Sequence, residues 1–210
     1  MRNSAYLRGA RAFGLASVVG LAIFLCLLQM VSLPIPGSGL LAPLVVIPRL
    51  LLASLTVGAL GAAFLKLGWR EILGFGLGFL VGESFLWIVF LLVFPSQPRP
   101  LEQLLYVPLV FFVGLGLASV VGTAFVRFSW TTIWIGAGAF GVGSAAGGFV
   151  NSLLHLLLFS FFPAYLSWPS PGPEGDLMDT LGYSAIGLVF IVLPHALGGA
   201  MLAARLEEIR

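Results

Sequence analysis

The chain has 210 residues, of which 60% are hydrophobic and 9% are charged, and its formal net charge is +2. Soluble domains carry about a quarter charged residues, so this composition indicates an integral membrane protein. The apolar runs are continuous rather than alternating, which favours helices over an outer-membrane barrel. The small net charge gives no indication of a nucleic-acid partner. Cys26 is the only cysteine, which excludes an intramolecular disulfide.

Six apolar runs are long enough to cross a hydrocarbon core about 30 Å thick, which takes about 20 helical residues. They predict an all-α integral membrane protein with one transmembrane domain over residues 1–210. The first run has 22 residues and lacks an A-x-A-like cleavage site, so it is interpreted as a membrane helix rather than a signal peptide. The predicted spans are 12–33, 41–66, 72–94, 104–126, 130–160 and 180–204.

The basic residues predict how these spans are oriented. Eight of the ten Lys and Arg residues lie at the two termini or after the second and fourth spans, whereas only Arg99 lies in a connection on the opposite side. By the positive-inside rule, both termini are expected in the cytoplasm and the chain in the cell inner (cytoplasmic) membrane. The outer connections are rich in proline and glycine. The longest, 163–180, is either a lid over an outward site or a plain connection.

Two predicted hairpins resemble each other. The segment AFLKLGW at 63–69 aligns with AFVRFSW at 124–130, an offset of 61 residues, and matches continue in the glycine-rich helices that follow. The alignment indicates a repeat of spans two and three in spans four and five. Convergence of apolar helices joined by basic turns is the alternative. Glu83 aligns with Ser144, so the carboxylate belongs to one copy only.

Glu83 lies near the middle of the third span. A carboxylate at that depth in lipid is unfavourable unless it faces a partner, a cavity or a ligand. Arg49 lies eight residues into the second span, about 12 Å from its outer end, and Glu83 lies eleven residues, about 16 Å, from the outer end of its own span. These depths predict either a structural ion pair or a solute held between the two charges.

Further polar residues are predicted in the same outer half of the protein. Trp87 is one helical turn from Glu83 and on the same face. Polar groups from several helices at one depth, with an aromatic ring among them, indicate a small-molecule pocket that opens outward. The predicted substrate-binding residues are Arg49, Glu83, Trp87, Gln29, Asn151 and His155.

The two histidines do not predict a haem site. His155 is expected toward the outer end of the fifth span and His195 nearer the cytoplasmic half of the sixth, about 10–15 Å apart along the membrane normal. A buried histidine bonded to a backbone carbonyl is the default expectation for each. The sequence shows no metal cluster, phosphate loop or cofactor motif, so no metal or cofactor is predicted.

Ser144 and the segment PHALGG at 194–199 resemble the Ser–His dyad of rhomboid intramembrane proteases. Val142 and Ala145 replace the glycines of that family's serine motif, and Asn151 and His155 follow the serine instead of preceding it. An enzyme is therefore not predicted. The protease remains a minor alternative, which requires Ser144 and His195 to lie within hydrogen-bonding reach.

Small residues are predicted to bring helices close together in two places. The fifth span contains six glycines between Gly136 and Gly148, which favours close packing over a break in the helix. In the first span, Ala12, Ala16 and Gly20 form a stripe at four-residue spacing. Such a stripe suits either packing within the chain or docking onto another membrane subunit.

Together with the length, the six spans and the outward polar site, this stripe resembles the S component of an energy-coupling factor vitamin transporter. The segment HALGGAMLAAR at 195–205 is similar to the last helix of several such subunits. The resemblance implies that the chain captures a vitamin or precursor from outside. It also implies docking on a transmembrane coupling subunit that is driven by ATPase subunits. The alternative is a non-catalytic accessory subunit of a larger membrane complex, with apolar grooves in place of a polar cavity.

Overall fold

The computed structural model of the chain is all-helical, as the sequence predicts. It describes residues 2–30, 41–93, 100–124, 129–161 and 177–209. Three of the helices contain stretches long and apolar enough to cross a membrane, Ser4–Leu27, Leu104–Ala124 and Trp130–Leu154, and a shorter apolar stretch covers Pro48–Phe64. The six helices are α1 (Arg2–Met30), α2 (Leu41–Phe64), α3 (Trp69–Val93), α4 (Pro100–Ala124), α5 (Trp130–Phe161) and α6 (Leu177–Ile209).

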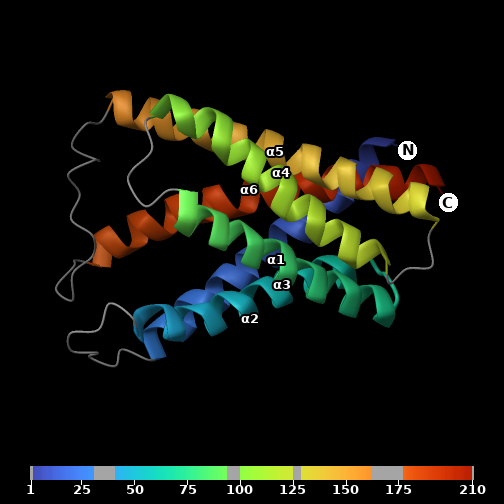
Figure 1. The fold of residues 1–210 in the computed structure, drawn as a ribbon, viewed down its shortest axis with the longest axis horizontal. Coiled ribbons are helices and arrows are strands. Elements are labelled where there is room, and N and C mark those ends of the chain that lie inside the picture. The colour runs from blue at the N-terminus through green and yellow to red at the C-terminus, as the bar shows by residue number, and fades with distance from the viewer. Residues whose placement is uncertain (1, 31–40, 94–99, 125–128, 162–176, 210) are drawn as a thin grey trace.

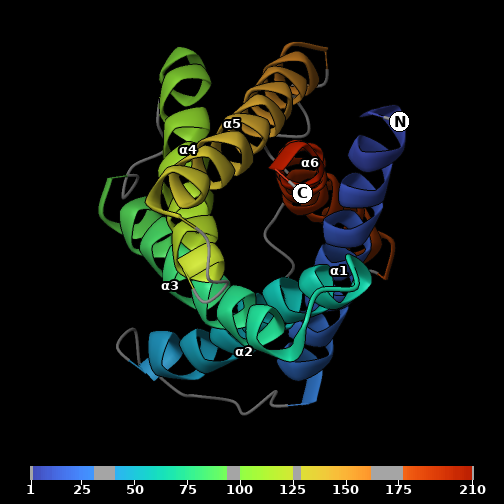
Figure 2. The ribbon, with the colours of Figure 1, turned by 90° about the vertical axis from the view of Figure 1, so that its right-hand side faces the viewer.

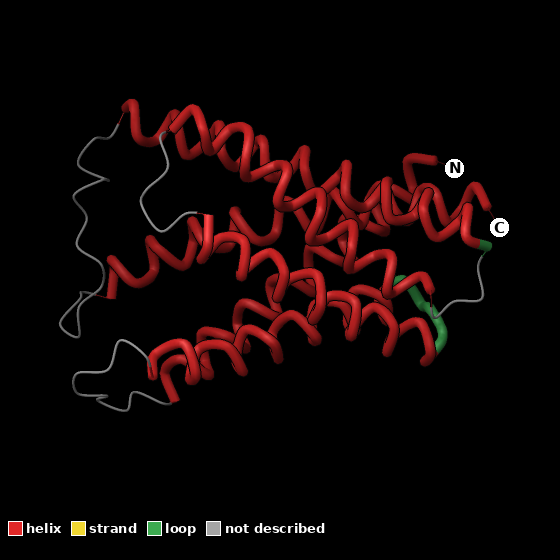
Figure 3. Tube along the Cα trace, in the orientation of Figure 1, coloured by secondary structure: helices red, strands yellow, loops and turns green. Residues whose placement is uncertain are grey.

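The helices form a closed ring in chain order. Each packs against its neighbours in the sequence, and α1 packs against α6 to close the circle (Figure 2). Both chain ends and the α2–α3 turn lie at one end of the molecule, which we call the terminal end (Figure 1). The helices diverge toward the opposite end. The described loop residues all lie at the terminal end (Figure 3), so the chain runs up and down through six antiparallel helices.

Local sequence explains where helices stop and start at the terminal end. α2 ends in a Schellman motif, in which Leu67 N donates to Ala62 O at 3.1 Å and Lys66 N donates to Ala63 O at 2.8 Å. Lys66 adopts the left-handed conformation that this motif requires, with φ 58°. At the start of α5, the Ser129 hydroxyl accepts a hydrogen bond from Thr132 N at 3.3 Å, which caps the helix.

Four phenylalanine side chains form a cluster inside the ring of helices. Phe13 of α1 lies 5.5 Å from Phe79 of α3 and 5.2 Å from Phe140 of α5, and 6.0 Å from Phe75, measured between ring centroids. All four side chains are fully buried. Aromatic pairs at these separations contribute about 0.5–1.5 kcal/mol beyond their burial. This cluster therefore ties α1, α3 and α5 together around one core.

Glycines let the helix backbones touch. A Cβ added at Gly82 would overlap the backbone of Gly114 on α4, and one added at Gly143 would overlap the carbonyl of Leu197 on α6. α5 runs without a break from Trp130 to Phe161. Close packing of the glycine-rich fifth helix is thus confirmed, and it draws α6 against α5 next to His195.

The small-residue stripe of α1 faces the interior. Ala12 and Ala16 are at most 3% exposed, and a Cβ at Gly20 would overlap the side chain of Val57 on α2. Of the two alternatives for this stripe, packing within the chain is the one that the structure shows. The outer surface is instead lined by large apolar side chains, including Trp69, Trp130 and Trp134, as suits contact with lipid.

Candidate functional site

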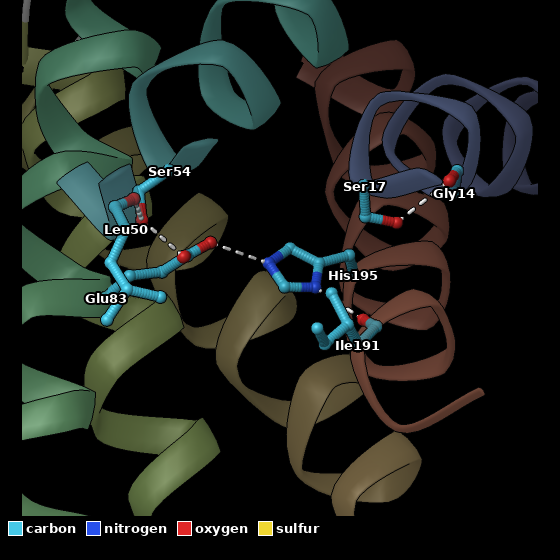
Figure 4. A network of polar contacts seen from close by, with 7 residues as sticks. All are labelled: Gly14, Ser17, Leu50, Ser54, Glu83, Ile191 and His195. Atoms are coloured by element: carbon cyan, nitrogen blue, oxygen red, sulfur yellow. Dashed lines mark hydrogen bonds and ion pairs between the residues drawn. The ribbon is translucent and has the colours of Figure 1, made fainter. Parts of the chain in front are cut away.

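Glu83 on α3 is the polar centre of the ring interior. Its side chain is 15% exposed, and both carboxylate oxygens are engaged (Figure 4). Oε2 lies 2.5 Å from the Ser54 hydroxyl on α2, and Oε1 lies 3.0 Å from Nε2 of His195 on α6. The carboxylate therefore has a partner on each of two other helices.

His195 is held in place from three sides. Its side chain is 4% exposed, and its ring lies 5.6 Å from that of Phe79, between centroids. Nδ1 lies 2.6 Å from the carbonyl oxygen of Ile191, one turn earlier in α6. A carbonyl only accepts, so Nδ1 carries a hydrogen and Nε2 is the atom that faces Glu83. The expected bond between a buried histidine and a backbone carbonyl is confirmed for His195.

Ser54 extends the contacts to the backbone of α2. Its hydroxyl lies 2.8 Å from the carbonyl oxygen of Leu50 as well as 2.5 Å from Glu83. A continuous chain of four contacts thus runs from Leu50 O through Ser54, Glu83 and His195 to Ile191 O. We call these five residues the Glu83–His195 network. α3 and α6 are not packed side by side in the ring, so the network reaches across its interior.

The network satisfies polar groups that would otherwise be costly in an apolar interior. A buried ionisable group without partners is unfavourable by several kcal/mol, and removal of one member of a buried pair typically costs about 3–5 kcal/mol. Replacement of a whole pair by apolar residues is often neutral or stabilising. Stability alone therefore does not account for a glutamate and a histidine at this depth, which is the reason to treat them as a functional site.

Arg49 does not contact Glu83, because the carboxylate is bonded to Ser54 and His195 instead. Arg49 precedes Ser54 by five residues on α2, which places it about 7 Å away along the helix axis. Its side chain is partly buried, and no ion pair or hydrogen bond joins it to another of the described residues. The direct pairing considered from the sequence is therefore replaced by the Glu83–His195 contact.

The other predicted site residues fall into two groups. Asn151 on α5 is fully buried but is not one of the groups bonded to Glu83 or His195. The side chains of Gln29, Trp87 and His155 lie outside the described part of the structure, so their place in a site stays a prediction.

Sequence reasoning missed Ser54 and gave His195 no place in the site. A signal was present in the helix lengths. Glu83 lies eleven residues after Ile72 and His195 ten residues before Arg205, which sets them about 17 Å and about 15 Å from the basic ends of their predicted spans. Because the two residues are about equally far from the basic ends of their helices, they are expected at the same depth in the protein. Distances counted from the outer ends do not show this.

The Ser–His dyad of the protease alternative is not formed. The Ser144 hydroxyl is fully buried and has no hydrogen-bond partner among the described residues. It faces Gly198 on α6, where an added Cβ would overlap it. Both ring nitrogens of His195 are directed to Ile191 and Glu83, so neither of them is available to Ser144 in this structure.

A separate apolar groove lies between α2 and α3 at the terminal end. Its volume is about 580 Å³, and its walls include Leu55, Ala59 and Leu77. Trp69 and Arg70 also line the groove, and the guanidinium of Arg70 stacks over the Trp69 ring, 5.5 Å from the ring centroid. The groove does not include any residue of the Glu83–His195 network.

Within the described ranges, no group of three or more His, Cys, Asp or Glu side chains could hold a metal ion. Comparisons with protein-family models, with curated proteins and with solved structures found no match to this chain.

Proposed function

We propose that this chain is a membrane-embedded subunit of a transporter that captures a small solute, a vitamin or a precursor, from the extracytoplasmic side. The observation that carries the proposal is the Glu83–His195 contact across the interior of the helix ring. Ionisable residues inside membrane helices mark substrate or ion pathways by default, because they are costly without a function. The contact joins helices that are not neighbours in the ring, so its replacement by solute contacts leaves the ring intact.

The proposed topology has six spans with both termini in the cytoplasm. Described Arg and Lys side chains gather at the terminal end, among them Arg8, Arg11, Lys66 and Arg205, which supports a cytoplasmic position for that end. The diverging ends of the helices then face outward. The α2–α3 and α4–α5 hairpins run in the same direction, which supports the proposed internal repeat.

Solute recognition would combine one cation with a set of hydrogen-bonding groups. Arg49 lies nearer than Ser54 to the diverging end of α2, above the network, and would bind an anionic or carbonyl group of the solute. Glu83, His195 and Ser54 would bind polar groups further in. Gln29, Trp87, Asn151 and His155 are the remaining proposed ligands. Active transport would require a transmembrane coupling subunit and ATPase subunits, which dock on a surface other than the buried stripe of α1.

The test is thermal unfolding of the full chain in lipid nanodiscs, followed by tryptophan fluorescence, with each water-soluble vitamin added in turn. We expect one compound to raise the unfolding temperature of the wild type by several degrees, because a ligand that binds only the folded state stabilises it. The shift should vanish in Glu83→Gln and weaken in Arg49→Gln. Co-purified small molecules, identified by mass spectrometry, provide a second readout.

Glu71→Gln is the matched control, since it makes the same change on the same helix outside the network. It should keep the ligand shift. If Glu83→Gln lowers the unfolding temperature without ligand but leaves any ligand shift intact, the network is structural and the proposed site is wrong.

The apolar groove between α2 and α3 favours one second candidate, the non-catalytic accessory subunit. That role requires apolar grooves for lipid or a neighbouring subunit, and the groove beside Arg70 and Trp69 has this character. The two proposals differ in what the wild type retains during purification. A solute supports the transporter subunit, and a stoichiometric protein partner without a solute supports the accessory subunit.

A further inference from the structure

The Glu83–His195 network has four close contacts in series and a backbone carbonyl at each end. The separations are 2.8 Å from Leu50 O to Ser54 Oγ, 2.5 Å from Ser54 Oγ to Glu83 Oε2, 3.0 Å from Glu83 Oε1 to His195 Nε2, and 2.6 Å from His195 Nδ1 to Ile191 O. All four are hydrogen-bond distances. Because the terminal carbonyls only accept, every hydrogen must come from the three side chains.

Three hydrogens are too few to fill these contacts. The Ser54 hydroxyl supplies one, and Nδ1 of His195 supplies one because it faces the carbonyl of Ile191. When Glu83 and His195 hold one more proton between them, as an ion pair or as a neutral pair, the total is three. Wherever that third hydrogen lies, one of the four contacts then either has no hydrogen of its own or shares one in a three-centre bond.

A fourth hydrogen fills every contact. Glu83 Oε2 then donates to Ser54 Oγ, and Ser54 Oγ donates to Leu50 O. Nε2 of His195 donates to Glu83 Oε1, and Nδ1 donates to Ile191 O. The additional proton comes from the solvent, and the network acquires a net charge of +1. We propose that the Glu83–His195 network is a binding site for one exchangeable proton, shared by α2, α3 and α6.

No other described charge compensates this proton directly. None of the ionisable side chains on the surrounding helices is bonded to Glu83 or His195, and Arg49, the one on the adjoining turn of α2, has the same sign as the proton. The polar groups of the network must therefore hold the charge, with Ser54 as the link that accepts one hydrogen and donates another. Besides Glu83 and His195, the ionisable described side chains are Tyr6, Arg8, Arg11 and Cys26 on α1, Arg49 on α2, Lys66 in the α2–α3 turn, Arg70 and Glu71 on α3, Tyr106 on α4, and Arg205, Glu207 and Glu208 on α6.

Two spectroscopic measurements on the full chain in lipid nanodiscs count the protons. Infrared spectroscopy detects the protonated carboxyl group of Glu83, assigned by its loss in Glu83→Gln. Nitrogen-15 NMR detects the doubly protonated ring of His195, assigned by its loss in His195→Gln. An ion pair shows only the histidine signal, and a neutral pair shows only the carboxyl signal. We expect both signals in the same sample, because only the state with four hydrogens gives both.

Ser54→Ala tests the link, and Ser84→Ala is its matched control. The Ser84 hydroxyl donates to the carbonyl of Leu80 at 2.5 Å, just as Ser54 reaches Leu50, but Ser84 does not contact Glu83. In Ser54→Ala, the ratio of protonated to ionised Glu83 should fall roughly fivefold at a fixed pH, since the protonated form loses one more hydrogen bond than the ionised form. Ser84→Ala should leave the ratio unchanged.

The wild-type count decides the proposal even if Ser54→Ala fails to fold. Observation of only one of the two signals across the accessible pH range overturns it. A rise in the protonated fraction of Glu83 in folded Ser54→Ala also overturns it, because the serine would then act solely as a donor to a carboxylate. The measurement of the proton count requires no solute, so its result is independent of whether the proposed transport function is correct.

Discussion

The contact between Glu83 and His195 joins two residues that are individually unfavourable in an apolar interior. Each is acceptable only because the other, together with Ser54 and the Ile191 carbonyl, completes its hydrogen bonds. Such mutual dependence has a measurable signature. The loss of one partner should cost more than the loss of both, because a buried polar group without a partner is worse than an apolar side chain.

We therefore predict a strongly non-additive double-variant cycle. His195→Phe keeps a ring next to Phe79 but leaves the Glu83 carboxylate with Ser54 alone, and it should lower the free energy of unfolding by about 3 kcal/mol. The double variant Glu83→Leu/His195→Phe should be nearer to the wild type than His195→Phe is. Unfolding in mixed detergent micelles, followed by tryptophan fluorescence, measures both values. Additive losses would show that the contact is not a coupled pair.

The residue scale is also where sequence reasoning was least complete. Glu83 is recognisable as a site residue because a carboxylate interrupts an apolar helix. Its partner is not recognisable in this way, since charge alone favours Arg49 and side-chain contacts depend on depth to within one helical turn. Arg49 is five residues from the turn of α2 that faces Glu83, whereas Ser54 and His195 are at its level. Sequence therefore identified the unusual residue but not its partners.

At the scale of helices, glycine positions determine how closely each pair can approach. α5 offers a direct comparison, because its glycines differ in what they face. A Cβ at Gly143 would meet the backbone carbonyl of Leu197, which cannot move out of the way without shifting α6. A Cβ at Gly138 would meet nothing within 4 Å. The sequence of α5 does not distinguish the two positions, because the helix is apolar on all sides and has no polar face. Only the packed structure shows which glycine is in close contact.

The pair of variants Gly143→Ala and Gly138→Ala should change stability in opposite directions. Gly138→Ala should raise the free energy of unfolding by up to about 1 kcal/mol, because alanine favours the helix over glycine. Gly143→Ala should lower it by about 2 kcal/mol or more, because the added methyl group forces α5 and α6 apart. The same detergent titration measures both. Equal effects of the two substitutions would contradict the close α5–α6 contact.

Gly143→Ala should affect the site as well as stability. Gly143 packs on Leu197, two residues after His195 on α6, so separation of the two helices moves the imidazole away from Glu83. The physical connection between glycine packing and the network explains how an apolar helix interface can position a polar contact across the ring.

For the whole molecule, the sequence predicts the class well and the internal arrangement only in part. The all-helical class and the approximate helix positions follow from continuous apolar runs separated by basic or proline-rich segments. The closure of the ring through α1 and α6 does not follow from them, because it depends on Gly9 meeting Gly199 across 190 residues of sequence. The Arg8–Glu207 ion pair at the same interface is 2.9 Å long but exposed, so it contributes little. Close backbone contact, rather than charge, closes the ring.

The proposed orientation of the helix ring in the membrane leads to a prediction about chemical labelling. Both chain ends lie at the terminal end of the structure (Figure 1), so a single membrane-impermeant reagent should distinguish the two ends in intact cells. In a Cys26→Ser background, Ser4→Cys and Glu207→Cys should be protected from a charged maleimide applied outside, because these exposed positions would lie in the cytoplasm. Ser38→Cys and Ser96→Cys, in the proposed outer connections, should react. Permeabilised cells provide the control, in which all four positions should be labelled. Labelling of Ser4→Cys and Glu207→Cys in intact cells would reverse the orientation, and Arg49 would then lie nearer the cytoplasmic side, where it could not receive a solute from outside.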